Sequence, residues 1–296
     1  MHKFLRAVGF SKIKTRKELT EIINKTIQEA TTREYATLQE EGNELFAIFC
    51  TDFADGLGLA VCGEFDEKDV FTYEYYYPYL RGSKVSSGED ITVERHAATE
   101  SYAGVCDENR IGVTLIFYLQ NIIAYKKQQN EKNLPIKGTT LNLSALSVKG
   151  TIVLPVAKSS QQKRAIRQKY NDRNRLISAA RQGNEAAIES LTLGDMDTYT
   201  TISKKIKTED VYSLVDSFFM PFGVECDQYS VLGEILEYKA VVNKLTKETI
   251  YIMRINCNGL EFDVCINAAD LMGEPKVGRR FKGNIWMQGI INYPNK

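Results

Sequence analysis

The sequence predicts a mixed α and β (α+β) fold in three parts: an N-terminal antiparallel sheet domain with helices, a helical connector and a small C-terminal β-barrel. Residues after Thr31 form short β-rich runs separated by turn residues. Between Ser159 and Phe222 this pattern gives way to helical periodicity. Long β patterns return after residue 224. The expected domain boundaries are therefore 1–157, 158–223 and 224–296.

The first domain is expected to open with a helix at 15–30, because Thr15 and Glu18 have the spacing of a capping box. The next four runs are separated by turn residues, which indicates an antiparallel meander with strands at 35–40, 45–53, 57–65 and 70–80. Further strands are expected at 91–97, 101–106, 111–121, 139–146 and 151–155. The apolar run 111–125 is also compatible with a buried helix.

The connector is expected to be helical, with a long first helix that starts near residue 159 and ends at Gly183. Two further helices are predicted at 184–193 and 195–206. A fourth is predicted to begin with Thr208 as its cap and to run through Phe218 and Phe219 to Pro221.

The third part contains long β patterns at 230–242, 249–257 and 260–266, a short helix at 268–272 and a final β stretch at 280–293. Gly283 and Gly289 interrupt this last stretch, and interior glycines often mark the bends of a small closed barrel. A helix between the third and fourth strands is also the order of an oligonucleotide- and oligosaccharide-binding (OB) barrel. An OB-like barrel is therefore one candidate fold.

Composition places this 296-residue chain, with 43% hydrophobic residues, among proteins that bury a real core. The first residues lack the apolar stretch of an export signal, and no apolar run is long enough to cross a bilayer. The six cysteines lie far apart, and with only two histidines the sequence offers no metal-ligand spacing. We therefore expect a cytoplasmic protein with reduced thiols, no metal, no cofactor and no membrane association.

Charge is unevenly distributed although the net charge is zero. Residues 41–108 contain 15 acidic and four basic side chains, a balance of −11. Residues 158–182 contain eight basic and one acidic, a balance of +7. The basic helix favours contact with phosphates, whereas the acidic segment can neutralise it within the chain or between two copies. Pairing of the two segments is the preferred interpretation.

Aromatic residues alternate in the segment FTYEYYYPYL. Regular alternation places Phe71, Tyr73, Tyr75, Tyr77 and Tyr79 on one face of a strand and Tyr76 on the other. A row of this kind can stack sugars or bases, and it can equally be the buried face of a sheet. Pro78 indicates that the strand lies at an edge.

Catalytic candidates are few. Glu94 and His96 would share one face of a strand, where the carboxylate can orient the imidazole. Together with Tyr75 they form the candidate site of an enzyme built from carboxylates and tyrosines. The structural alternative is a histidine at the rim of a sheet. No phosphate-binding loop is present, because Gly56 and Gly58 lack the following lysine.

Nucleic-acid binding is the second functional hypothesis, and it rests on cations next to an aromatic side chain. The candidate residues come from the basic helix and from the C-terminal module: Lys163, Arg164, Arg167, Arg279, Arg280, Lys282 and Trp286. Against this hypothesis, residues 224–296 contain nine acidic and nine basic side chains. A lone tryptophan most often fills a core.

Four segments resemble an uncharacterised bacterial family that is described only as a domain of unknown function: MHKFLRAVGFSK, SYAGVCDENRIGVTLIFYLQN, FFMPFGVECDQYSVLGEI and CNGLEFDVCINAADLMGEPKVGRRFKGNIWMQG. The resemblance spans nearly the whole chain. It implies a bacterial cytoplasmic setting and supplies no catalytic residues.

The function itself is not defined by any motif in the sequence. The favoured hypothesis is a non-catalytic interaction or regulatory protein that binds a protein partner or associates with itself. Nucleic-acid binding through residues 158–181 and the barrel is one alternative, and an enzyme is the other.

Overall fold

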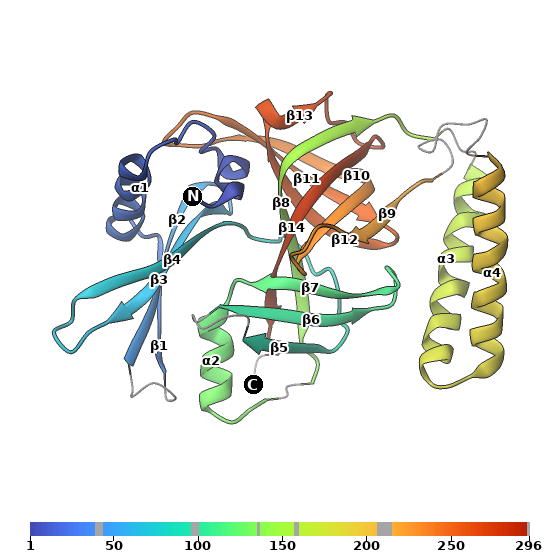
Figure 1. Cartoon of the computed structure of the whole chain (residues 1–296), viewed down its shortest axis with the longest axis horizontal. Helices are drawn as coiled ribbons and strands as arrows, with labels where there is room; N and C mark the ends of the chain where they lie inside the picture. Colours follow the sequence, from blue (N-terminus) through green and yellow to red (C-terminus); the bar gives the residue numbers. More distant parts are fainter. Residues whose placement is uncertain (39–43, 96–100, 135–136, 157–159, 206–214, 295–296) are drawn as a thin grey trace.

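The computed structural model describes residues 1–38, 44–95, 101–134, 137–156, 160–205 and 215–294, which form two β-sheets and a helical hairpin (Figure 1). Sheet A and the N-terminal helix occupy one side of the molecule. The hairpin stands at the opposite side, and sheet B lies between them. This arrangement confirms the predicted mixed α+β class.

Sheet A is the predicted antiparallel meander, with strand order β1-β2-β3-β4. Its strands are β1 (Thr32–Leu38), β2 (Glu44–Ala54), β3 (Leu57–Phe65) and β4 (Phe71–Leu80). The preceding helix α1 (Arg16–Gln28) begins with the predicted capping box, in which the Thr15 side chain accepts from the Glu18 backbone N–H. Helix α1 lies on the outer face of the sheet, where the Thr51 hydroxyl donates to the Thr26 carbonyl oxygen. Strand β4 is an edge strand, as Pro78 indicated.

The predicted single row of aromatic side chains on β4 is wrong. In the register of β3 and β4, Cys62 pairs with Tyr75 while the next residue, Gly63, pairs with Tyr73, so Glu74 is an extra residue in a β-bulge. Because a bulge reverses the alternation of side chains, Phe71 and Tyr73 face outward and Tyr75, Tyr77 and Tyr79 face sheet B.

Sheet B contains ten strands within the described residues, in the order β13-β8-β12-β11-β10-β14-β7-β6-β5, with β9 paired to β10. Their bounds are β5 (Ile91–Arg95), β6 (Tyr102–Glu108), β7 (Val113–Leu119), β8 (Thr140–Val153), β9 (Phe218–Pro221), β10 (Gln228–Val242), β11 (Thr249–Cys257), β12 (Leu260–Asn267), β13 (Leu271–Met272) and β14 (Arg280–Asn292). Strand β8 also pairs with β14. It joins two segments that the sequence predicted as separate strands.

The short 3₁₀ helices η1 (Lys3–Val8) and η3 (Ala268–Asp270) pack against sheet B. The hydrophobic core fills the space between the two sheets. Tyr77 of sheet A and Tyr118 of sheet B meet there with ring centroids 4.7 Å apart. The apolar run 111–125 divides into strand β7 and helix α2 (Ile122–Asn130), so both sequence interpretations hold for part of it.

The connector forms a hairpin of two long helices, α3 (Ser160–Arg181) and α4 (Glu185–Lys205). The predicted break between 193 and 195 is wrong. Gly194 lies inside α4, and packing against α3 offsets the poor helix propensity of a single glycine. Thr208, the predicted cap of a fourth helix, lies outside the described residues. Phe218 and Phe219 are in strand β9, where pairing with β10 and burial of Phe219 against Tyr229 override helical periodicity.

Two glycines make room for one buried aromatic ring. Gly150 of β8 and Gly283 of β14 are cross-strand partners. A Cβ at Gly150 would lie 2.5 Å from the Phe281 ring, and one at Gly283 would lie 2.6 Å from it.

We expect Gly150→Ala to lower the free energy of unfolding by about 1–3 kcal/mol, because overpacking displaces the Phe281 ring. The matched control is Gly194→Ala in α4, where a Cβ meets nothing within 4 Å. This control should leave stability unchanged or raise it by up to about 1 kcal/mol, since alanine favours helix. Urea unfolding of both variants measures the effect, and equal midpoints would contradict the prediction.

Candidate functional site

The tyrosines of the predicted catalytic and stacking sites are mostly buried. Tyr77 and Tyr79 are each 3% exposed, and Tyr75 is half-buried against the core. Burial raises the pKa of all three phenols well above the usual range. They therefore stay protonated near neutral pH, and Tyr79 donates its proton in a hydrogen bond to the Asp52 carboxylate. Only Tyr73 of this group presents a large surface to solvent.

The candidate pair Glu94 and His96 is described in part. Glu94 is exposed on β5, an edge strand of sheet B, whereas Tyr75 belongs to sheet A. His96 lies outside the described residues. Groups of three or more histidine, cysteine or carboxylate side chains able to hold a metal do not occur in the described part of the chain.

Cysteine chemistry is equally limited. All six thiols are unpaired, and four of them, Cys62, Cys106, Cys257 and Cys265, are buried. Burial raises the pKa of the Cys50 and Cys257 thiols to about 12. A nucleophilic cysteine needs a lowered pKa, so these side chains are suited to packing.

Trp286, a candidate for base stacking, is 5% exposed and belongs to an aromatic cluster at the N-terminus. Its ring lies 5.4 Å from that of Phe4, 5.2 Å from Tyr118 and 4.8 Å from His2. The indole N–H donates to the Asp227 carboxylate at 2.6 Å. Every surface of the indole that could hold a base is therefore engaged within the protein.

Arg280, a second candidate, is also 5% exposed and holds the base of the hairpin. Its guanidinium donates to the Leu154 carbonyl oxygen, where the chain leaves β8 for the hairpin, and to the Val215 carbonyl oxygen on the returning segment, at 2.8 and 2.7 Å. Arg279 and Lys282 are half-buried, and the Arg279 guanidinium donates to the Glu274 carbonyl oxygen. Arg164 is exposed on α3, which also carries Lys163 and Arg167.

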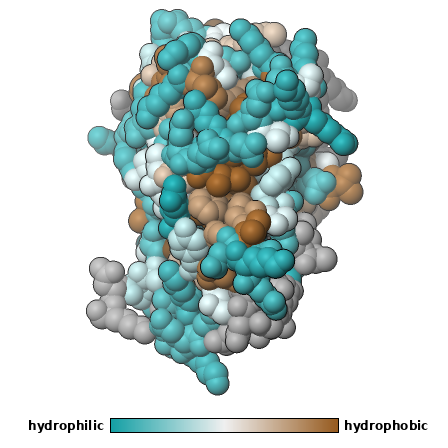
Figure 2. Space-filling view, turned by 90° about the vertical axis from the view of Figure 1, so that its left-hand side faces the viewer, coloured by the Kyte–Doolittle hydropathy of each residue, from teal (hydrophilic) through white to brown (hydrophobic). Residues whose placement is uncertain are grey.

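The outer face of sheet A carries an apolar patch that α1 leaves uncovered. Figure 2 shows this brown area at the centre of the face that holds α1 and sheet A. Tyr35, Phe49, Phe65 and Phe71 form a connected set of rings with centroids 4.8 to 6.4 Å apart. The patch also includes exposed side chains, namely Tyr35 (39%), Leu45 (37%) and Tyr73 (44%).

Acidic side chains border one end of this patch. The loop between β3 and β4 exposes Asp66, Glu67 and Asp69 against the single cation Lys68, and Glu74 of the bulge is exposed nearby. We call the patch and this border the aromatic face. An exposed apolar patch with a polar rim is typical of an interaction surface.

A second surface lies between α3 and sheet B. Two adjoining cavities of about 840 and 1050 Å³ share Arg110 and Asn174. We call the space of these two cavities the α3 groove. A third cavity, of about 330 Å³, is lined by α3 residues alone and lies outside the groove. The helix wall of the groove is mostly polar: Asn171, Asn174, Arg175, Ser178, Ala179 and Gln182 line it. The Arg181 guanidinium at the end of α3 donates to the Asp107 carbonyl oxygen.

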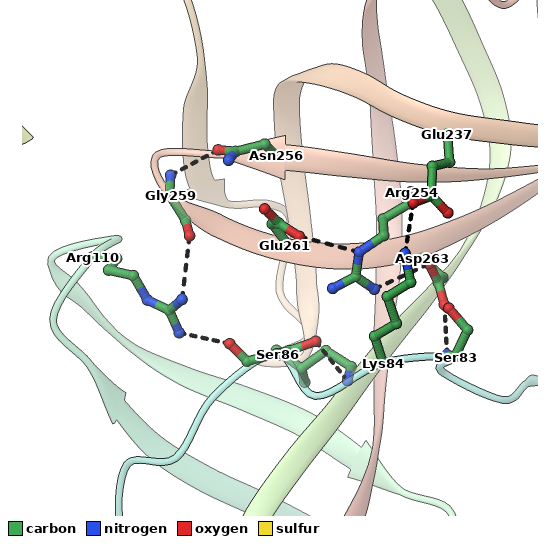
Figure 3. A network of polar contacts seen from close by, with 11 residues as sticks. Ser83, Lys84, Ser86, Arg110, Glu237, Arg254, Asn256, Gly259, Glu261 and Asp263 are labelled. Atoms are coloured by element: carbon green, nitrogen blue, oxygen red, sulfur yellow. Dashed lines mark hydrogen bonds and ion pairs between the residues drawn. The ribbon is translucent and has the colours of Figure 1, made fainter. Parts of the chain in front are cut away.

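The opposite wall of the groove is fixed by a network of ion pairs (Figure 3). Arg254 of β11 is 5% exposed and contacts Asp263 at 3.4 Å and Glu261 at 3.2 Å. The Asp263 carboxylate accepts from the Ser83 backbone N–H at 2.6 Å, which holds the loop after β4 against β12.

Arg110 connects three segments of the same wall (Figure 3). Its guanidinium donates to the Glu108 carboxylate, to the Ser86 carbonyl oxygen and to the Gly259 carbonyl oxygen. Burial opposes ionisation of Glu108, but the hydrogen bonds and charge of Arg110 hold the pKa of this carboxyl below its usual range. The Ser87 hydroxyl donates to the same carboxylate. The wall is therefore rigid and internally neutralised.

Comparison with known proteins identifies the family. The model described as "Domain of unknown function, E. rectale Gene description (DUF3881)" matches residues 5–289. The chain belongs to the DUF3881 family. Neither the curated proteins nor the solved structures that were compared contain a match. The DUF3881 match spans both the aromatic face and the α3 groove. Among the described residues, every helix is too short or too polar to cross a bilayer.

Sequence reasoning missed the aromatic face of this DUF3881 chain, although part of its signal was present. Phe49, Phe65 and Phe71 each lie on the outward face of a different strand, and only the strand registers bring them together. It also missed the groove, because α3 and the turns of sheet B that line the groove are far apart in the sequence.

Proposed function

We propose that this protein is a non-catalytic interaction protein that binds a basic amphipathic helix of a partner protein on its aromatic face. The observation that carries this proposal is the ring cluster of Tyr35, Phe65 and Phe71 on sheet A, in which Tyr35 is exposed and the two phenylalanines are half-buried. The exposed Tyr73 lies next to it on β4. At the centre of protein–protein interfaces charged side chains are depleted, and aromatic side chains contribute much of the binding energy.

The helical form of the partner follows from α1. Ile23 and Thr26 of α1 are buried against the same outer face, so this sheet already packs one amphipathic helix. The uncovered half of the face offers the same kind of apolar surface to a second helix lying beside α1. Basic side chains on that helix complement Asp66, Glu67, Asp69 and Glu74.

A synthetic 18-residue helix of leucine and lysine tests this proposal, with a leucine and glutamate helix as the charge control. We expect the lysine peptide to bind the wild-type chain and the glutamate peptide to bind at least tenfold more weakly. The double variant Leu45→Ser/Tyr73→Ser should weaken binding of the lysine peptide at least tenfold, because both changes remove apolar area that binding would bury.

The matched control is Met272→Ser, which removes a side chain that is 72% exposed on β13 in sheet B. This variant should bind the lysine peptide like the wild type in isothermal titration calorimetry. Equal affinity for the two peptides, or an unchanged affinity of the Leu45/Tyr73 variant, would contradict the proposal.

Three finer features belong to the same proposal. Strands β8, β12, β11, β10 and β14 pair in succession and β14 pairs back to β8, which supports a closed, OB-like barrel that includes residues 140–153. The boundaries at 157/158 and 223/224 then delimit the connector of α3 and α4, while the barrel takes β8 from the part before it and the other strands from the part after it. The unpaired cysteines support a cytoplasmic location.

Nucleic-acid binding stays the alternative. What supports it is that the α3 groove brings Asn171 and Asn174 of the basic helix to Arg279 and Arg280. Against it stand the engaged positions of Trp286 and Arg280 described above.

A further inference from the structure

We propose that the α3 groove binds an extended peptide segment of a partner protein, at a surface separate from the aromatic face. The groove follows α3 from Asn171 to Gln182, which is about 17 Å at 1.5 Å per residue. An extended chain of about five residues has this length.

The side chains on the helix wall match the polar groups of a peptide backbone. Asn171 and Asn174 of α3 and Gln182 directly after it line the groove, and within the described residues their amide groups have no hydrogen-bond partner. Each amide presents a donor and an acceptor together, as a peptide unit does. A row of such groups can therefore bind a main chain without requiring a particular side chain.

The charges of the groove exclude a strongly charged ligand. Arg110 is neutralised by Glu108, the Arg280 guanidinium is occupied by backbone carbonyl oxygens, and Lys276 pairs with Glu274 at 3.0 Å. Arg175 on the helix wall lines the same cavity as Glu89, and Glu234 lines the adjoining cavity. Both signs are present without a large excess, whereas a polyanion needs a basic surface.

The described lining residues also lack the aromatic side chains on which bases and sugar rings stack. Peptide remains the polymer whose recognition needs neither stacking nor a phosphate-binding surface. On the side of sheet B, Arg280 binds the carbonyl oxygens of Leu154 and Val215, and Arg110 and Arg254 fix the wall opposite α3.

Selection from a phage-displayed library of random 12-residue peptides, followed by calorimetry with synthetic copies of the enriched sequences, tests this proposal on the full chain. We expect enriched peptides whose affinity falls at least tenfold in the double variant Asn171→Ala/Asn174→Ala. Both alanines favour helix, so α3 persists. The control Glu189→Ala on α4, an exposed residue outside the groove lining, should bind like the wild type.

Other outcomes separate this proposal from its alternatives. Peptides that lose affinity in the Leu45→Ser/Tyr73→Ser variant and keep it in the Asn171/Asn174 variant bind the aromatic face. That result would overturn the groove proposal and leave the proposed function standing. Salt-sensitive displacement of the peptides by a single-stranded 12-nucleotide RNA would replace peptide with nucleic acid as the ligand. A selection without enrichment would also overturn the inference.

Discussion

Asp263→Asn is expected to lower the free energy of unfolding by about 3 kcal/mol, because it leaves the buried Arg254 guanidinium without the charge that faces it. Both side chains of this pair are 5% exposed. Removing one partner of a buried ion pair typically costs about 3–5 kcal/mol. The lower end applies here because Glu261, whose side chain is 42% exposed, still contacts Arg254.

The control is the exposed ion pair of Lys84 and Glu237, whose side chains are 52% and 64% exposed. Glu237→Gln should cost far less stability than Asp263→Asn, since solvent screens such pairs. The double variant Arg254→Met/Asp263→Leu, which removes both charges, should recover most of the lost stability. Urea unfolding of the four proteins measures these differences. Similar losses for Asp263→Asn and Glu237→Gln would show that the buried pair has no special role.

Stability should fall as the pH is lowered from about 6.5 to about 4, and His2 should contribute up to about 3 kcal/mol of this loss. Burial among aromatic rings, together with the nearby Lys3 and the N-terminal ammonium, lowers the pKa of His2 from 6.5 to about 4. Between these two pH values, His2 binds a proton in the unfolded chain but not in the folded chain. The contribution of His2 to the free energy of unfolding is therefore complete above pH 6.5 and is lost as the pH approaches 4.

The variant His2→Gln isolates this effect from the titration of carboxylates. The difference in unfolding free energy between wild type and variant, measured on the untagged chain from pH 4 to pH 7, should increase with pH. The His2 Nδ1 accepts from the Phe4 backbone N–H at 3.4 Å, and a glutamine oxygen can accept the same bond. A constant difference over this pH range would contradict the lowered pKa of His2.

Much of the secondary structure could be predicted because its signals are local. Thr15 and Glu18 lie three residues apart, so the capping box and the start of α1 follow directly from the sequence. The meander of sheet A is equally local, since each strand pairs with the next and turn residues separate them. Phe218 and Phe219 were misassigned because a distant strand, β10, decides their conformation.

The candidate surfaces were less predictable, because segments that are distant in the sequence form them. Trp286 and Arg280 stood out in the sequence as an aromatic and a cation, and both proved to be buried by segments far away in the chain. The bulge at Glu74 shifts the register of β4 against β3 by one residue. This shift divides the predicted row of tyrosines into an exposed part and a buried part.

The sequence by itself determined the α+β class, the meander, the helical connector and the family resemblance, because composition, periodicity and capping act over a few residues. Only the tertiary structure decided that β8 pairs with both β12 and β14, which rings form the aromatic face and which polar side chains line the α3 groove. These features depend on strand register and on contacts between distant segments, which the order of residues along the chain does not specify locally.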